Sequence, residues 1–331
     1  MTRPIPLMAF ATASLLPVAL LLIGLASSSV WLWLALFYMA VLTILLDQLI
    51  PRTTATAEAQ EFPAATALLV TIAAAHLAAL PLATWAVAGD SGLSTPDRIA
   101  TFLAAGLWFG QVTHPAAHEL IHRPRRGLVA LGVSLYTSLL FGQHASSHRL
   151  VHHRHVASRD DPNTARAGES YYRFARRAWI GGFRQGWQAE TALRANRPGP
   201  HPYALYLTGA LACLALAFAL AGPLGVAPWT LLALHAPSQI LLSDYVQHYG
   251  LTRARLPDGR LEPVGPRHSW NTPHWFSSAM LLNAPRHSDH HAHPGRPFPA
   301  LRLPDDAPTL PWPLPLAATM ALAPRLWRRA I

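Results

Sequence analysis

Long apolar stretches constrain the fold of this chain more than any other feature of its sequence. Six of them reach or approach the length of about 20 residues that a helix needs to cross the hydrocarbon core of a bilayer. They cover residues 7–26, 29–47, 64–88, 98–117, 204–222 and 226–245. Charged residues make up only 13% of the 331 residues, whereas an average soluble domain has about 25%. We therefore expect an all-α integral membrane protein with six transmembrane helices.

The distribution of arginine predicts how these helices are oriented. All 26 basic residues are arginine, and the net charge is +10. If the chain starts in the cytoplasm, the outer loops are 27–28, 89–97 and 223–225, and none of them contains an arginine. The inner segment 146–203 contains ten arginines. Cytoplasmic loops carry such an excess, so we expect both termini and the catalytic face in the cytoplasm, at a bacterial inner membrane. The positive charge then faces anionic lipid, and we expect no nucleic-acid partner.

The same assignment divides the chain into four parts. Residues 1–122 hold four transmembrane helices and end in a first group of histidines, and residues 123–203 hold a second group and the arginine-rich cytoplasmic segment. Residues 204–245 form a transmembrane hairpin, and residues 246–331 form a cytoplasmic tail with two further groups. The apolar stretch 127–145 is interpreted as a re-entrant or surface helix, because a crossing would separate the first two groups of histidines.

Histidine is unusually frequent, with 18 residues against 16 acidic ones. Nine histidines form four short groups, which are His118 and His122; His148, His152 and His153; His248; and His287, His290 and His291. Residues three or four positions apart share one face of a helix, so each group can present several imidazoles together. Imidazole is a ligand for iron, zinc, copper and nickel, and nine of them are enough for two metal ions. The single Cys213 excludes a disulfide framework, a CxxC zinc site and an iron–sulfur cluster.

The motifs around these histidines resemble those of the membrane-bound alkane hydroxylases, which are non-haem di-iron monooxygenases and include the xylene monooxygenase hydroxylase component. The matching segments are HELIH at 118–122, HRLVHHRHVASRDDP at 148–162, DYVQHYG at 244–250, RHSWN at 267–271 and RHSDHHAHP at 286–294. The third motif departs from the family pattern at Asp244 and Gln247. The resemblance implies a fold like that of the fatty acid desaturases and hydroxylases, with a cytoplasmic, histidine-rich helical cap. It also implies two iron ions bound by the nine histidines above.

The activity implied by the resemblance is hydroxylation of an alkane or alkyl group at a terminal or benzylic carbon, using O2. Such an enzyme takes its apolar substrate from the membrane. It takes electrons from a rubredoxin or ferredoxin-type donor with its reductase, and the arginine-rich segment is a candidate for binding that donor.

Carboxylates that accept the outer N–H of a metal-bound imidazole orient its ring. Glu119, Asp289 and Asp244 lie in or beside the histidine groups and are predicted to act in this way. Asp160 and Asp161 are further candidates, although Asp-Asp-Pro is also a common loop turn.

Three alternative functions are consistent with parts of the pattern. A fatty-acyl or lipid desaturase or hydroxylase would use the same iron chemistry. His118 to His122 also matches the HExxH motif of zinc peptidases, but that reading leaves seven clustered histidines unexplained. A metal transporter would place histidines along several spans, whereas here they follow the ends of the apolar stretches.

Overall fold

The computed structural model describes residues 4–57, 63–196 and 199–331. Throughout these ranges the secondary structure is helical, apart from two isolated β-bridges, so the all-α prediction is confirmed. Arg197, one of the ten arginines counted above, lies outside the described residues. The α-helices are α1 (Leu7–Ala26), α2 (Val30–Phe37), α3 (Thr43–Leu49), α4 (Pro63–Ala88), α5 (Thr95–Trp108), α6 (His114–Ile121), α7 (Arg126–Ser138), α8 (His144–Ser147), α9 (His153–His155), α10 (Tyr171–Arg194), α11 (Pro202–His248), α12 (Trp275–Met280), α13 (His287–Ala292), α14 (Leu314–Ala321) and α15 (Pro324–Ala330).

Three short π-helices and two 3-10 helices connect some of these elements. The π-helix η1 (Tyr38–Leu42) joins α2 to α3, and η2 (Phe109–Thr113) joins α5 to α6. The third π-helix, η3 (His148–His152), lies between α8 and α9 and contains two of the predicted ligands. The 3-10 helices are η4 (Pro266–His268) and η5 (Phe298–Ala300).

Four helical segments among the described residues are long and apolar enough to cross a membrane, namely Leu7–Ala26, Val30–Leu49, Pro63–Ala88 and Pro202–His248. The expected span 98–117 lies within the run formed by α5, η2 and α6, which is not one of the four. The expected spans 204–222 and 226–245 both lie within α11. Length and composition therefore support four candidate spans and do not confirm six.

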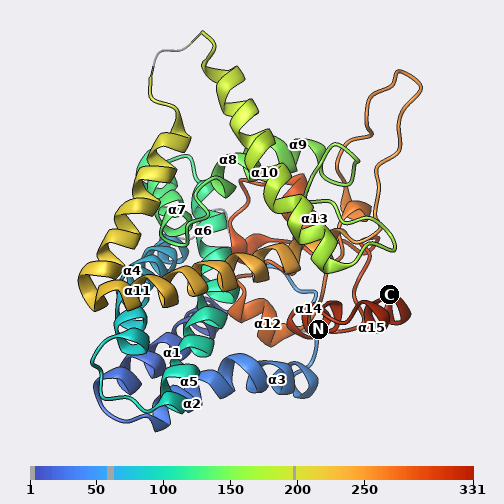
Figure 1. The fold of residues 1–331 in the computed structure, drawn as a ribbon. Helices are drawn as coiled ribbons and strands as arrows, with labels where there is room; N and C mark the ends of the chain where they lie inside the picture. Colours follow the sequence, from blue (N-terminus) through green and yellow to red (C-terminus); the bar gives the residue numbers. More distant parts are fainter. Residues whose placement is uncertain (1–3, 58–62, 197–198) are drawn as a thin grey trace.

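Helix α11 is bent at Ala221 and Gly222, where the backbone leaves the helical conformation. Gly222 has φ 62°, a left-handed value that glycine adopts at no steric cost. Pro223 follows and has no N–H to continue the helical hydrogen bonds. Figure 1 shows the second half of α11 turning away from the first and running toward the region of α13. The bend therefore directs His248, the last residue of α11, toward the other histidines.

Large apolar side chains point outward from the first half of α11. Leu205 and Leu211 are 63% and 66% exposed on the protein surface. A helix that presents leucine outward in this way is stable against lipid rather than water. The protein is accordingly a membrane protein.

The segment after the first group of histidines returns to it rather than leading away. Helix α7 has 13 residues, about 20 Å at 1.5 Å per residue, which is shorter than the hydrocarbon core of about 30 Å. It packs closely on α6, because a Cβ on Gly132 would lie 2.8 Å from the carbonyl oxygen of Ala117. The chain then turns through Leu139–Gly142 into α8 and η3, and this brings His148 beside His118, as the sequence predicted.

Buried hydrogen bonds attach the C-terminal part of the chain to the N-terminal helices. The Oδ1 atom of Asp47, on α3, accepts from the backbone N–H groups of Phe276 and Ser277 at 2.9 and 3.0 Å, at the start of α12. The buried Arg286 donates to the carbonyl oxygens of Leu301 and Ala55 at 2.6 and 2.9 Å. These contacts fix the segment that precedes α13 and its three predicted ligands.

Candidate metal centre

All nine predicted ligand histidines converge in space and form two groups. The first group is His118, His122, His148, His153 and His290, and the second is His152, His248, His287 and His291. Within each group the potential ligand atoms all lie within 4.8 Å of one another. The second group is buried, whereas the first consists of two buried and three half-buried residues. No single segment supplies a group, so each site exists only in the folded chain.

Local helix geometry decides which group each histidine joins. His118 and His122 are four residues apart on α6 and point to the same group. In η3 the wider turn of a π-helix aligns His148 with His153, whose Nε2 atoms are 2.9 Å apart, and turns His152 to the other group. A π-helical turn of this kind is frequent at functional sites.

The short helix α13 also contributes to both groups. His287 and His291, four residues apart, face the second group, and their Nε2 atoms are 3.0 Å apart. His290 faces the first group, 3.2 Å from the Nε2 atom of His153. One turn and a half of helix thus connects the two sites.

The ring nitrogens face one another at distances that suit a shared cation. The Nε2 atom of His118 lies 2.7 Å from that of His148, and the Nε2 atom of His248 lies 3.0 Å from that of His287. The Nε2 atoms of His122 and His152 are buried and have no hydrogen-bond partner. Buried polar atoms without a partner are rare and costly, so converging imidazole nitrogens fit a metal ion in each group.

The protonation states of three of the nine histidines also suit metal binding. Burial lowers the pKa of His148, His287 and His290 well below its usual value, and the neighbouring imidazoles lower it further. The neutral imidazole is the form that binds a metal ion. These histidines therefore need not lose a proton at neutral pH before a metal binds.

Among the described residues, Asp161 is the carboxylate that bonds to one of the nine histidines. Its Oδ2 atom lies 2.8 Å from Nδ1 of His152 and also accepts from the hydroxyl of Thr164 at 2.7 Å. This leaves Nε2 of His152 for the second group. The sequence offered Asp161 only as one of two residues in an Asp-Asp-Pro turn, and its position nine residues after His152 gave no stronger signal.

The three carboxylates predicted to orient the rings bond to other partners. Glu119 accepts from Arg123 at 2.7 Å and from the backbone N–H of Phe298 at 3.1 Å. Asp289 is paired with Arg296, accepts from the N–H of Arg302 at 2.8 Å and lies 3.1 Å from Nδ1 of His293. Asp244 accepts from the side-chain amide of Asn163 at 2.6 Å. They therefore connect the segments that carry the ligands rather than the ligand rings themselves.

A largely apolar cavity of about 200 Å³ adjoins both groups. His118, His148 and His290 of the first group and His287 of the second reach its wall. Leucines cover much of the remainder, namely Leu107, Leu242, Leu281, Leu282, Leu301, Leu314 and Leu322. An apolar molecule in this cavity would lie directly beside the predicted ligand histidines.

Comparison with known proteins agrees with this site. A family model described as "Fatty acid desaturase" matches residues 97–307, which include all nine histidines. The chain is 35% identical over 264 residues to alkane 1-monooxygenase 1 of Alcanivorax borkumensis, covering 76% of this chain and 63% of that protein. It is 30% identical over 310 residues to alkane 1-monooxygenase 2 of Pseudomonas aeruginosa, covering 90% and 82%.

A more distant relative is the hydroxylase component of the xylene/toluene monooxygenase of Pseudomonas putida, which is 27% identical over 250 residues. The chain belongs to the histidine-box family of membrane-bound alkane hydroxylases and xylene monooxygenases. It matches a little under two thirds of the length of the Alcanivorax and Pseudomonas putida relatives, at 63% and 65%.

Proposed function

We propose that the protein is a membrane monooxygenase that hydroxylates an apolar substrate, an alkane or alkyl group, at a terminal or benzylic carbon. One atom of O2 enters the C–H bond, and the other is reduced to water by two protons and by two electrons from an external donor. The observation that carries the proposal is the convergence of nine imidazoles into two groups beside an apolar cavity. The names of the relatives, alkane 1-monooxygenase and xylene/toluene monooxygenase, support it.

Two iron ions are the proposed cofactors, one for each group of histidines. Iron held by these imidazoles would supply the O2 chemistry that no side chain can provide. The chain contributes the ligands, and Asp161 holds the ring of His152 in the orientation that leaves Nε2 free for the metal. The leucines of the cavity keep water away from the substrate and hold its carbon next to His118, His148 and His287.

Glu119, Asp289 and Asp244 are proposed to act as positioning residues. Asp289 binds Arg296 and the N–H of Arg302 and thereby fixes α13. Glu119 connects α6 to η5 through the N–H of Phe298. Asp244 connects α11 to the loop of Asp161 through Asn163.

Product analysis tests the proposed reaction and separates it from desaturation. Cells that express the chain with a rubredoxin-type donor and its reductase would be fed alkanes, alkylaromatic compounds and fatty acids. We expect terminal or benzylic alcohols to accumulate, and none in cells that express the His290→Ala variant. Double bonds or hydroxyl groups introduced only into acyl lipids would instead identify a lipid desaturase or hydroxylase with the same metal centre.

We propose six transmembrane segments, with the metal centre and both termini on the cytoplasmic side of a bacterial inner membrane. The α5–η2–α6 run adds a fifth segment to the four candidate spans, and counting the two halves of α11 separately gives the sixth. The concentration of arginine in residues 146–203 supports this orientation.

Reporter fusions test the orientation. A reporter fused after Ile331 is expected to give a cytoplasmic signal, whereas the same reporter after Gly92, in the arginine-free loop 89–97, is expected to give a periplasmic one. A periplasmic signal after Ile331 would contradict the proposed topology.

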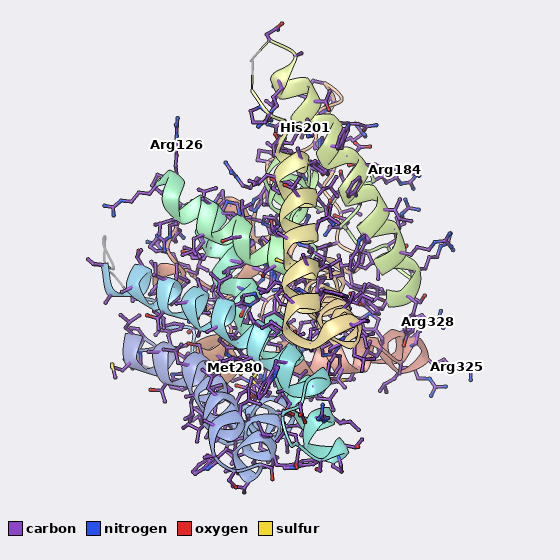
Figure 2. The ribbon with its side chains drawn as sticks, turned by 60° about the vertical axis from the view of Figure 1, so that its left-hand side comes forward. Arg126, Arg184, His201, Met280, Arg325 and Arg328 are labelled. Atoms are coloured by element: carbon purple, nitrogen blue, oxygen red, sulfur yellow. The ribbon has the colours of Figure 1, made fainter. Side chains whose placement is uncertain are left out.

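The electron donor is proposed to be an acidic rubredoxin or ferredoxin-type protein that binds an arginine-rich edge. Figure 2 shows Arg184 of α10 and Arg325 and Arg328 of α15 pointing away from the ribbon along one edge of that view. The start of α10 and the end of α14 are connected by a hydrogen bond of 2.9 Å from the hydroxyl of Tyr172 to the carbonyl oxygen of Leu322. Opposite charges on two proteins accelerate their association, so electron delivery by this route weakens as salt is added.

A further inference from the structure

One wall of the cavity is polar along its length. His235, Gln239, Ser243 and Gln247 follow one another on α11 at intervals of four residues, and all four line the cavity. Residues at this spacing share one face of a helix. Gln111, on η2, adds a third amide to the cavity wall from a different element. Within this row the Ser243 hydroxyl donates to Oε1 of Gln247 at 2.9 Å, and Nε2 of Gln247 donates to the carbonyl oxygen of Ala284 at 3.1 Å, so these two residues already have partners in the chain.

The amides of Gln111 and Gln239 meet at the end of the cavity away from the histidine groups. The Nε2 atom of Gln111 donates to Oε1 of Gln239 at 3.2 Å, and Nε2 of Gln239 donates to the carbonyl oxygen of Gly106 at 2.9 Å. The approach depends on Gly110, where a Cβ would lie 2.5 Å from Nε2 of Gln239. The bond to Gly106 gives Gln239 a structural role, but it does not explain the presence of Gln111.

Polar atoms around this amide pair lack partners. The Oε1 atom of Gln111 and the Nε2 atom of His235 are buried and have no hydrogen-bond partner. Leaving such groups unpaired in an apolar environment is unfavourable. A hydrogen-bonding group on a molecule in the cavity would give these atoms a partner.

The amide pair lies at a defined distance from the metal-binding histidines. Seven residues separate Gln111 from His118, and nine separate Gln239 from His248, about 10 and 14 Å at the rise of a helix. Both helical segments run from the amide contact to the histidine groups. An extended alkyl chain of medium length therefore spans the interval between the amides and the metal centre.

We propose that the cavity recognises an alkyl chain that carries an uncharged hydrogen-bonding group, such as an ester, amide or hydroxyl, at the end remote from the metals. Gln111, assisted by Gln239, binds that group, and the opposite end of the chain lies beside the histidines. The group is uncharged, because no arginine lines the cavity and its two carboxylates, Glu119 and Asp244, would repel an anion. The inference rests on the proposed function in naming which end of the chain is oxidised.

The test compares decane with methyl decanoate on the purified holoenzyme, supplied with its electron donor, and measures KM and kcat for each. The Gln111→Met variant keeps the length of the side chain and removes its hydrogen bonds. We expect a KM about tenfold higher for the ester in this variant, the effect of one lost hydrogen bond to a buried group. The KM for decane should not rise. Thr319→Val is the matched control, because the Thr319 hydroxyl lines the same cavity but already donates to the carbonyl oxygen of Pro315 at 2.9 Å.

Direct binding of both compounds to wild-type and variant protein, measured by calorimetry in nanodiscs, keeps the inference separate from the proposed reaction. If the wild type binds the ester more tightly than decane, and Gln111→Met reduces this difference, the inference is supported. Failure of the protein to oxidise either compound would overturn the proposed function alone and would leave this result intact. Equal binding of the two compounds by the wild type, or equal losses for both in the variant, would overturn the inference. If the Gln111→Met variant does not fold, the comparison of ester and decane binding by the wild type still tests the inference.

Discussion

The His152→Ala variant is expected to retain about one iron per chain instead of about two, and to lose more than about 100-fold in hydroxylation rate. Removing even an outer partner of a metal ligand costs about 10–100-fold in metal affinity or activity, and His152 is one of only four histidines in the second group. The first group shares no ligand with the second, so its metal should remain. Iron content by elemental analysis and product formation with a saturating donor check both parts of the prediction.

His201→Ala is the matched control for this loss. His201 packs on the ring of Trp187, with ring centroids 4.3 Å apart, and lies in neither histidine group. Both iron content and activity should stay at wild-type levels. A His152→Ala protein that still bound two irons and turned over normally would remove His152 from the ligand set.

The Asp161→Ala variant is expected to lower metal affinity at the second group by about 10–100-fold, the usual effect of removing a carboxylate that orients a ligand histidine. Without the acceptor for its Nδ1–H, the His152 ring can rotate or change tautomer and no longer presents Nε2 to the metal. Thr164 also loses its acceptor, at 2.7 Å. Iron retained after dialysis against a graded series of chelator concentrations measures the change.

The neighbouring Asp160→Ala variant separates this effect from a general disturbance of the loop. Asp160 is exposed, and Nη2 of Arg255 lies 3.8 Å from its carboxylate, a kind of surface pair that contributes about 0–1 kcal/mol. Its iron retention should match that of the wild type. Equal losses in the two variants would mean that Asp161 acts through the loop and not through His152.

The convergence of the histidines could be predicted from the sequence because each group has helical spacing and lies at the end of an apolar stretch. His118 with His122, and His287 with His291, point the same way for that reason alone. The division into two groups could not be predicted. It depends on the π-helical turn of η3, which sends His152 and His153 to different groups, and a π-helix has no distinctive pattern in a single sequence.

Two other features depended on tertiary contacts. Asp161 reaches His152 because the loop after α9 folds back, whereas Glu119 and Asp289 lie next to ligands in sequence but bind Arg123 and Arg296. Nearness along the chain was therefore a poor guide to which carboxylate contacts a ring. The sequence predicts six apolar spans, whereas the described residues contain four candidates, because the α5–η2–α6 run carries polar groups and because α11 bends at Gly222 without ending.

The proposed activity depends on two metal ions held by imidazoles from four separate segments. Metal analysis of the purified wild-type protein, isolated from cells supplied with both iron and zinc, tests this most directly. We predict about two irons per chain, one for each group of histidines. Zinc in place of iron in a fully active protein, or full activity with no bound metal, would contradict it.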